Sequence, residues 1–348
     1  MTTFTLRSSR TLTVQAAALA AAAALLLAGC STDAAGGSDA AGSDSEADAI
    51  AAIAAKADPT KPESSSITGA VWQGAISAQW FLGAPTAADY GVELKSDWMT
   101  DATVGRAQLV AGEIAIVPGS TGGAVQLAQS GVDALIVAGN YESEEGRQVV
   151  YVMPDSGITS VADLAGKTLG ATAISGSWPN RIRLAMKDAG ADPTSLNVVA
   201  TTYGDMAEQL KSGTVDAVIA ASFALPAVKA TGAVPVFDVG GGPYAGRPEN
   251  VWLTTREYYE KNPNTIAVFQ CAMLAGAALA NQRPEMESYL ADTLGWEQKL
   301  IDVSPSPISI DGPLDLAQVQ ADWDDEVAVN GSPEFDVATL VIPEPASC

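Results

Sequence analysis

The chain has 348 residues, of which 41 are acidic, 18 are basic and none is histidine, so its formal net charge is −23 at pH 7. Such a negative field repels nucleic acids and anionic lipid surfaces, and we expect neither as a partner. The lack of histidine excludes histidine-based zinc sites, Ser-His and Cys-His catalytic pairs and a histidine pH switch.

The first 30 residues have the pattern of an export signal. Arg7 and Arg10 precede an uncharged, mostly apolar stretch at 14–28, and small residues lead from it to Cys30. The stretch has the length of a signal-peptide core and is too short to cross a hydrocarbon layer of about 30 Å. It resembles a bacterial lipoprotein signal, with residues 1–29 as the peptide that is removed. The resemblance implies a lipid on Cys30 and a location on the outer face of the cytoplasmic membrane.

Residues 30–66 consist mainly of Ala, Gly, Ser and Asp and contain few large apolar side chains. Such a segment buries too little surface to offset the entropy that is lost on ordering. We therefore predict a flexible tether over residues 30–66.

The two other cysteines are Cys271 and Cys348. Outside the cytoplasm the environment is oxidising, so these two can form a disulfide that joins the C-terminal tail to a helix. The alternative is a buried Cys271 in an Ala-rich helix and a free thiol at Cys348.

From residue 67 onward, short apolar strands alternate with helical patterns. The expected strands cover 67–72, 92–95, 114–117 and 134–138, and the expected helices cover 78–90, 102–111 and 122–130. A second set of strands covers 148–153, 168–172, 214–220 and 234–239. A strand at 251–255 follows, and then helical segments at 264–281, 284–294 and 314–329. This alternation predicts mainly parallel sheets covered by helices.

These elements predict an α/β fold of two lobes, each a mainly parallel sheet flanked by helices. The first lobe takes residues 67–146 and 250–348, and the second takes 147–249. The chain crosses between the lobes near 147–153 and again near 246–255, after the turn-forming glycines and proline at 240–243. Two such lobes on an exported chain indicate a binding protein of the venus-flytrap kind.

Four segments in the same order resemble the ABC-transporter solute-binding proteins of the nitrate/sulfonate/taurine family, described as SsuA-like and NMT1/THI5-like. They are 108–115 (QLVAGEIA), 158–167 (ITSVADLAGK), 175–177 (SGS) and 213–217 (GTVDA). The resemblance implies the periplasmic-binding-protein fold of type II. The chain departs from the family pattern at Ala115, where an acidic residue is common, and lacks the histidine of several family pockets.

The resemblance further implies a lipid-anchored, monomeric solute-binding protein that delivers a sulfonate-like, nitrate-like or other organic anion to an ABC permease and ATPase. No catalysis, cofactor or metal is expected. One alternative is a sensory binding protein that presents its ligand to a signalling receptor. Another is a binder of a planar heterocycle such as a pyrimidine thiamine precursor. A catalytic relative of the pyrimidine-precursor synthases is disfavoured by the missing histidine.

Ligands of open α/β sheets bind beyond the carboxyl ends of the strands, where loops lead into helix N-termini. The predicted ligand-binding residues in these loops are Trp72, Gln73, Gly119, Ser120, Thr121, Asn140, Tyr141, Ser175, Gly176, Ser177, Trp178, Ser222 and Phe223.

Two of the loops, 119–122 and 175–177, combine glycines with small hydroxyl residues at the start of a helix. Free backbone N–H groups and the helix dipole favour an anion there, although the hydroxyls can equally serve to cap their own helices. Trp72, Trp178 and Phe223 are candidates for stacking on a ligand. Arg181 either reaches an anionic ligand or lies on a solvated helix face.

Overall fold

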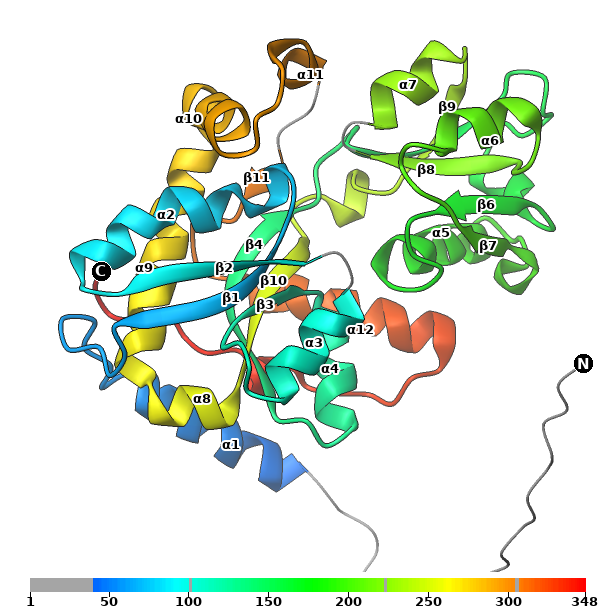
Figure 1. Cartoon of the computed structure of the whole chain (residues 1–348). Helices are drawn as coiled ribbons and strands as arrows, with labels where there is room; N and C mark the ends of the chain where they lie inside the picture. The colour runs from blue at the N-terminus through cyan, green and yellow to red at the C-terminus, as the bar shows by residue number, and fades with distance from the viewer. Residues whose placement is uncertain (1–39, 100–101, 222–223, 304–306) are drawn as a thin grey trace, which may run out of the picture. The chain divides into compact units, whose positions relative to one another are not determined.

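One sheet of the computed structural model lies within residues 148–238 and has the strand order β7-β6-β8-β5-β9. The structure describes residues 40–99, 102–221, 224–303 and 307–348. The strands of this sheet, green in Figure 1, are β5 (Gln148–Val152), β6 (Thr168–Ala171), β7 (Asn197–Ala200), β8 (Ala217–Ala221) and β9 (Val234–Asp238).

Alternate residues of β5 face two separate cores. Val150 and Val152 lie in one core with α5, whereas Val149 and Tyr151 lie in the other with α6 and α7. Successive side chains of a strand point to opposite faces, so a sheet that is apolar on both faces needs helices on both. The covering elements are α5 (Ser177–Asp188), α6 (Met206–Ser212), α7 (Ala224–Ala230), η2 (Val161–Leu164), η3 (Pro193–Ser195) and η4 (Gly242–Tyr244).

The rest of the described chain builds around a four-stranded sheet of order β11-β4-β10-β3 and a parallel pair, β1 and β2. An isolated parallel bridge between Gly69 and Ile116 links the pair to the start of β3. The strands are β1 (Ser66–Trp72), β2 (Glu93–Met99), β3 (Val117–Gly119), β4 (Ala134–Glu142), β10 (Pro248–Thr255) and β11 (Ile308–Ser309).

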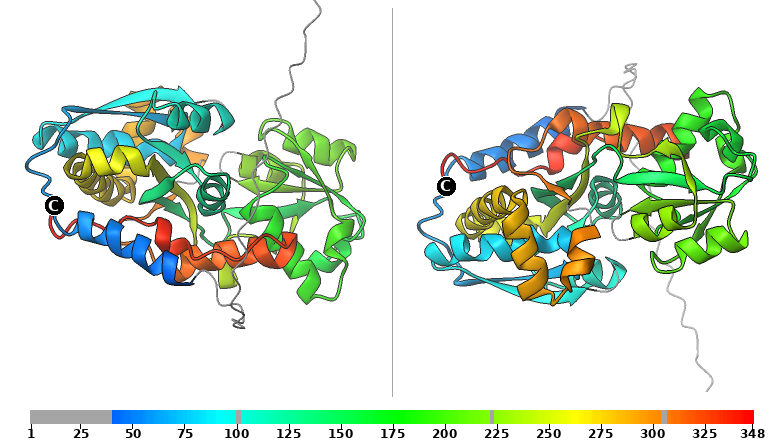
Figure 2. Two further views of the ribbon diagram at one scale, coloured as in Figure 1. Left: turned by 90° about the horizontal axis from the view of Figure 1, so that it is seen from below. Right: turned by 90° about the horizontal axis from the view of Figure 1, so that it is seen from above.

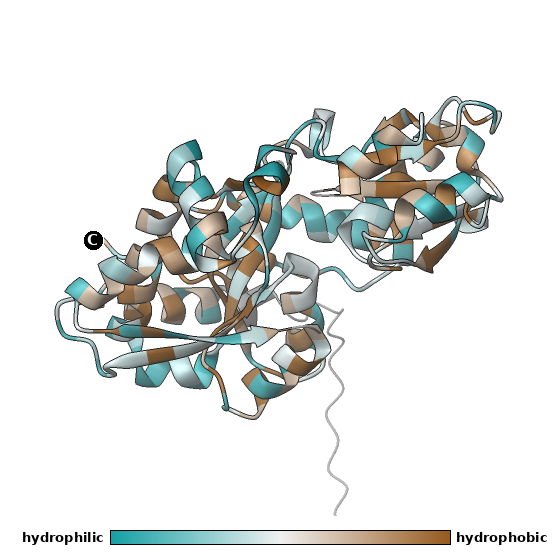
Figure 3. Ribbon diagram, turned by 45° about the horizontal axis from the view of Figure 1, so that its top comes forward, coloured by the Kyte–Doolittle hydropathy of each residue, from teal (hydrophilic) through white to brown (hydrophobic). Residues whose placement is uncertain are grey.

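Helices cover both faces of this second sheet as well. Side chains of α1, α2 and α9 share one core with β4 and β10, and side chains of α4 and α12 share the other. Figure 3 shows the hydrophobic residues gathered on the strands of both sheets. The elements are α1 (Ala40–Ala54), η1 (Ala75–Ser77), α2 (Ala78–Asp89), α3 (Ala102–Val110), α4 (Thr121–Gln129), α8 (Arg256–Lys261), α9 (Pro263–Ala280), α10 (Arg283–Ser288), η5 (Tyr289–Thr293), α11 (Gln298–Val303), α12 (Leu316–Asn330) and η6 (Val337–Leu340).

Among the described residues, α9 is long and apolar enough to span a membrane, but 67% of it is buried inside the fold. It packs closely along α2 because two glycines lack side chains at the contact. A Cβ on Gly83 would lie 2.1 Å from the carbonyl oxygen of Ala272, and a Cβ on Gly276 would lie 2.0 Å from that of Gln79. Helix α9 is therefore a core helix of this fold.

Strand direction follows from where the chain crosses between the sheets. In the five-stranded sheet β5 is antiparallel to both of its neighbours, and β10 is antiparallel to both β3 and β4 in the other sheet. Each of these strands follows a strand of the other sheet, with only the three-residue η4 before β10, and so runs away from the edge at which it enters. In the five-stranded sheet the other strands end at the edge where β5 enters. In the four-stranded sheet β3 and β4 end at the edge where β10 enters. The predicted α/β fold is confirmed, but the sheets are mixed and not mainly parallel: the three strand pairings of the four-stranded sheet and two of the four pairings in the five-stranded sheet are antiparallel.

The predicted tether over residues 30–66 is wrong for the residues that the structure describes. Residues 40–54 form α1, in which Ile50 and Ala54 are buried against the core around α9. The Tyr259 hydroxyl donates to the carbonyl oxygen of Ile50 at 3.2 Å, and Arg256 pairs with Glu46. Figure 2 shows α1, in blue, lying against the body of the fold. The low hydrophobicity of the segment concealed one apolar face, on which a single isoleucine is buried. Residues 30–39 lie outside the described part.

Strand β7 was not predicted, because its burial is weak. Asn197 and Ala200 are exposed and only Val198 and Val199 between them are half-buried, as befits an edge strand. Four residues with two apolar positions are too short a pattern to identify a strand.

The C-terminal tail returns to α9. Cys271 lies within α9 and forms a disulfide with Cys348, with the two Cα atoms 5.3 Å apart. The buried amide of Gln270 donates to the carbonyl oxygens of Ile342 and Pro343, at 3.3 and 3.1 Å. The last residues are thus held beside α9 by covalent and polar contacts together.

Replacing Ile50 with alanine tests whether α1 belongs to the folded body. Removing this buried side chain is expected to lower the free energy of unfolding by about 2–4 kcal/mol, measured by urea denaturation. The matched control is Ala51→Ser on the exposed side of α1, for which we expect a change within about 0.5 kcal/mol. Equal stability of the two variants would contradict the packing of α1.

Candidate functional site

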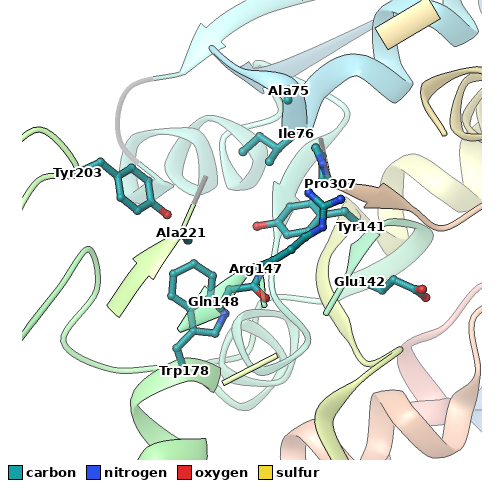
Figure 4. Close-up of a pocket in the computed structure, with 10 residues that line it drawn as sticks. All are labelled: Ala75, Ile76, Tyr141, Glu142, Arg147, Gln148, Trp178, Tyr203, Ala221 and Pro307. Atoms are coloured by element: carbon teal, nitrogen blue, oxygen red, sulfur yellow. The ribbon is translucent and has the colours of Figure 1, made fainter. Parts of the chain in front are cut away.

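Two adjoining pockets share Tyr141 and Trp178 and together form a cleft. The first has a cavity volume of about 60 Å³, opens to solvent, and draws residues from both sheets and their helices (Figure 4). Its lining consists of Ala75, Ile76, Tyr141, Glu142, Arg147, Gln148, Trp178, Tyr203, Ala221 and Pro307. The second pocket adds the loop at 172–177, Ser120, Pro179 and Glu249.

Three aromatic side chains surround the first pocket. Tyr141 lies near the end of β4, Trp178 lies in the first turn of α5, and Tyr203 follows β7. The phenol oxygens of the two tyrosines point toward each other across the space (Figure 4). Tyr141 lies at the carboxyl end of a strand and the other two follow such an end, which is where the fold places its ligand loops. The cleft therefore offers ring faces for an apolar or planar ligand body.

Both phenols are neutral at ordinary pH. Burial raises the pKa of Tyr141, and the nearby Glu249 carboxylate and Tyr203 raise it further. Burial also raises the pKa of Tyr203, against the opposing effect of a hydrogen bond with Thr172. Each hydroxyl can therefore take part in hydrogen bonds as an uncharged group.

Arg147 is the positively charged group in the lining of the first pocket. It lies directly before β5 and pairs with Glu144, while its side chain stays 22% exposed. Burial lowers the pKa of Arg147, which remains a cation at neutral pH. The other charged lining group, Glu142, points away from the space in Figure 4, and burial and Asp311 raise its pKa. The cation is the better placed of the two to meet a ligand.

The N-terminus of α5 borders the second pocket. Gly176 precedes the helix with φ of +102°, a conformation that favours glycine, and makes no side-chain cap. The first backbone N–H groups of this 12-residue helix lack a capping side chain, so they favour an anion. The hydroxyl of Ser177 is not free, because it donates to Asp322 at 2.9 Å.

Arg181 of α5 lies behind this helix start and is fully buried. Its guanidinium donates to Ser143 at 2.8 Å and to Asp322 at 3.2 Å, and it forms an ion pair with Glu249. Both expectations for Arg181, ligand contact and a solvated helix face, are wrong. The carboxylates of Glu249 and Asp322, which pair with Arg181, lie far away in the sequence. The helical pattern around Arg181 therefore could not predict them.

One guanidinium serves two carboxylates in this cluster. Glu249 also accepts from Ser143 and from the indole N–H of Trp178, the latter at 2.5 Å. Asp322 has the longer bond to Arg181 and fewer donors. Burial therefore raises the pKa of Asp322, with Arg181 opposing the shift and Glu249 adding to it. Burial opposes the charge of Arg181, but the two carboxylates outweigh it and raise its pKa.

Six of the predicted ligand-binding residues line the cleft. They are Ser120, Tyr141, Ser175, Gly176, Ser177 and Trp178. Ser120 also caps α4 by accepting from the N–H of Gly123 at 3.1 Å. At this position the serine therefore both caps its own helix and lines the pocket.

Five predicted residues line neither pocket, each for a local reason. Trp72 packs against the core, and Gln73 beside it is exposed. The Cα of Gly119 faces Leu253, Thr121 is buried, and Asn140 is buried and donates to Asn250 at 3.0 Å. Ser222, Phe223 and Cys30 lie outside the described residues.

Twelve of the residues that line the cleft were not predicted, among them Ile76, Arg147, Gln148, Tyr203 and Glu249. Arg147 and Gln148 lie at the first predicted crossing between the lobes, directly before and at the start of β5, and Glu249 is the second residue of β10, the strand that returns. A search of both crossings for polar side chains would have found them. Ile76 lies in the short helix η1 and Tyr203 lies in a turn, and neither belongs to a sequence motif.

Replacing Asp322 with asparagine tests the electrostatics of this cluster. Because its folded-state pKa is raised, the carboxyl contributes stability that is present below its unfolded pKa, about 3.9, and is lost as the pH rises through the folded pKa. The stability advantage of the wild-type protein over Asp322→Asn should therefore shrink between pH 4 and pH 7, measured by urea denaturation. An advantage that grows with pH would mean that Arg181 dominates.

Comparison with known proteins gives a family match over part of the chain. Residues 129–287 match the family model described as NMT1/THI5 like. No curated protein matched the sequence.

Solved structures share the fold at low sequence identity. The periplasmic aliphatic sulphonate binding protein SsuA from Escherichia coli has a TM-score of 0.64 at 20% identity, over 82% of this chain and 94% of its own. The periplasmic nitrate-binding protein NrtA from Synechocystis PCC 6803 has 0.62 at 13%, over 80% and 85%. The desulfurization enzyme DSZB has 0.56 at 17%, over 80% and 96%. At these identities the likeness concerns the fold alone. The chain thus carries an NMT1/THI5-like domain and has the fold of the periplasmic binding proteins.

Proposed function

We propose that this chain is an exported, lipid-anchored solute-binding protein that captures a small organic anion between two lobes and delivers it to an ABC importer. The observation that carries the proposal is the cleft, whose lining converges from both sheets around Tyr141 and Trp178. The lobes take residues 67–146 with 250–348, and 147–249, and would close on the ligand by a hinge at the two crossings.

The anion is supported by two features of the cleft. Arg147 offers a cation to the first pocket, and the start of α5 offers uncapped backbone N–H groups to the second. The rings of Tyr141, Trp178 and Tyr203 would enclose the organic part of the ligand. A sulfonate or carboxylate with a short apolar or planar body meets both requirements.

A planar heterocycle is the second candidate. Among the described residues, the side-chain oxygen of Gln148 is buried without a hydrogen-bond partner, and Gln148 lines the first pocket. An unpaired buried acceptor is costly, and a ring N–H of a heterocycle would pair with it. We propose binding rather than catalysis in either case, since the buried carboxylates beside the cleft are already engaged by Arg181.

Arg147→Gln should weaken binding of an anion about 10- to 100-fold, because a charge-assisted hydrogen bond contributes about 1.5–3 kcal/mol. Ligand-free protein is first screened by thermal shift against alkanesulfonates, nitrate, carboxylates and pyrimidines, and affinities are then measured by calorimetry. Arg183→Gln is the matched control, because it also removes one positive charge, but from a residue of α5 that lines neither pocket. Stabilisation by pyrimidines and by no anion would replace the anion with the heterocycle.

Cys30→Ala tests the anchor. Without the lipidated thiol the protein should move from the membrane fraction to the soluble exported fraction, with unchanged ligand affinity. The measurement is fractionation followed by immunoblotting, with the wild-type chain alongside. Retention of the variant in the membrane fraction would refute lipid anchoring at Cys30.

A further inference from the structure

We propose that Arg181 is a positioning residue of the cleft, which acts on Ser177 and Trp178 through two carboxylates that it holds in place. The inference rests on the proposed solute-binding function, since it assigns Arg181 a role in ligand affinity without ligand contact. Its basis is a chain of contacts that starts at the pocket wall and ends at a fully buried guanidinium.

The three residues share one face of α5. Ser177 and Trp178 precede Arg181 by four and three positions, which places them on neighbouring rows of a helix. Ser177 donates to one oxygen of Asp322, and Arg181 donates to the other. Trp178 donates to one oxygen of Glu249, and Arg181 and Ser143 donate to the other. Each carboxylate therefore bridges a pocket residue to the same arginine.

The carboxylates come from outside α5 and its sheet. Glu249 lies in β10, the strand that returns to the other sheet, and Asp322 lies in α12. Figure 2 shows α12, in orange-red, reaching from the rest of the fold to the green helices. Arg181 thus fixes the pocket end of α5 against the two elements that cross to it. If either carboxylate turned away, the indole of Trp178 or the hydroxyl of Ser177 would lose its fixed direction.

A neighbouring ion pair shows what a merely structural role looks like. Arg247 pairs with Asp325 at 2.6 Å, also on α12, and lies over the ring of Tyr244 at 4.9 Å. Arg181 lies over the same ring, at 5.2 Å. Arg247 and Asp325 line neither pocket, and within the described part of the chain their ion pair does not involve Ser177 or Trp178. Asp325→Asn is therefore the matched control for changes at Glu249 and Asp322.

The first experiment needs no ligand. Protein labelled with ¹⁵N-tryptophan has seven indole N–H signals, and the signal of Trp178 is assigned from its loss in Trp178→Phe. Glu249→Gln and Arg181→Lys should both move this signal while the other six stay in place, and Asp325→Asn should leave all seven. An unmoved Trp178 signal in folded Arg181→Lys would overturn the inference. Lysine keeps the buried charge, so this variant is expected to fold where Arg181→Met does not.

The second experiment measures affinity for ethanesulfonate by calorimetry. Glu249→Gln and Trp178→Phe should each weaken binding about tenfold. The double variant should also lose only about tenfold in affinity, because both substitutions remove the same hydrogen bond between Trp178 and Glu249. Asp325→Asn should bind as the wild-type protein does. Losses that multiply in the double variant would overturn the inference. If the wild-type protein does not bind ethanesulfonate, the proposed ligand class fails, while the tryptophan signals still decide the role of Arg181.

Discussion

The buried charge of Arg181 is the constraint on which the geometry of the cleft depends. A guanidinium without solvent must be paired, and removing one partner of such a pair costs about 3–5 kcal/mol. The partners here come from β10 and α12, so the requirement joins three elements that are distant in sequence. The same bonds lie directly behind the start of α5, which borders the second pocket. Folding stability and the shape of the binding surface are thus maintained by one set of contacts.

Local patterns predicted most of the fold. Strands such as β5 and β8 are continuous apolar runs, and burial on both faces requires helices on both sides of the sheet, so the class followed from the alternation of strand and helix patterns along the chain. The pattern failed where burial is partial, at β7, and where one buried isoleucine decides the outcome, at α1. A residue-by-residue pattern cannot show that Ile50 packs in a core whose members outside α1 lie beyond residue 65.

The site was predictable where loops follow strands and unpredictable where pairing is long-range. Ser175, Gly176 and Trp178 were found because they follow β6 at its carboxyl end. Ser177 was found too, but its partner Asp322 lies 145 residues away, and nothing in the sequence connects them. Arg147 was not predicted as a lining residue because its position next to the crossing was interpreted only as a boundary between the lobes. A strand that crosses a cleft also contributes its first side chains to it.

Helix α1 has a consequence for how the protein meets the bilayer. Because α1 begins at Ala40 and packs on the folded body, the chain from a lipidated Cys30 to the start of α1 is ten residue spacings long instead of about 35. Fully extended, ten residues reach about 35 Å, which is comparable to the thickness of the membrane itself. With the proposed anchor and the proposed importer, the protein would be held close to the permease, with the α1 side nearest the lipid. The anchored protein would then reach the proposed transporter by diffusing in the plane of the membrane, with its orientation restricted.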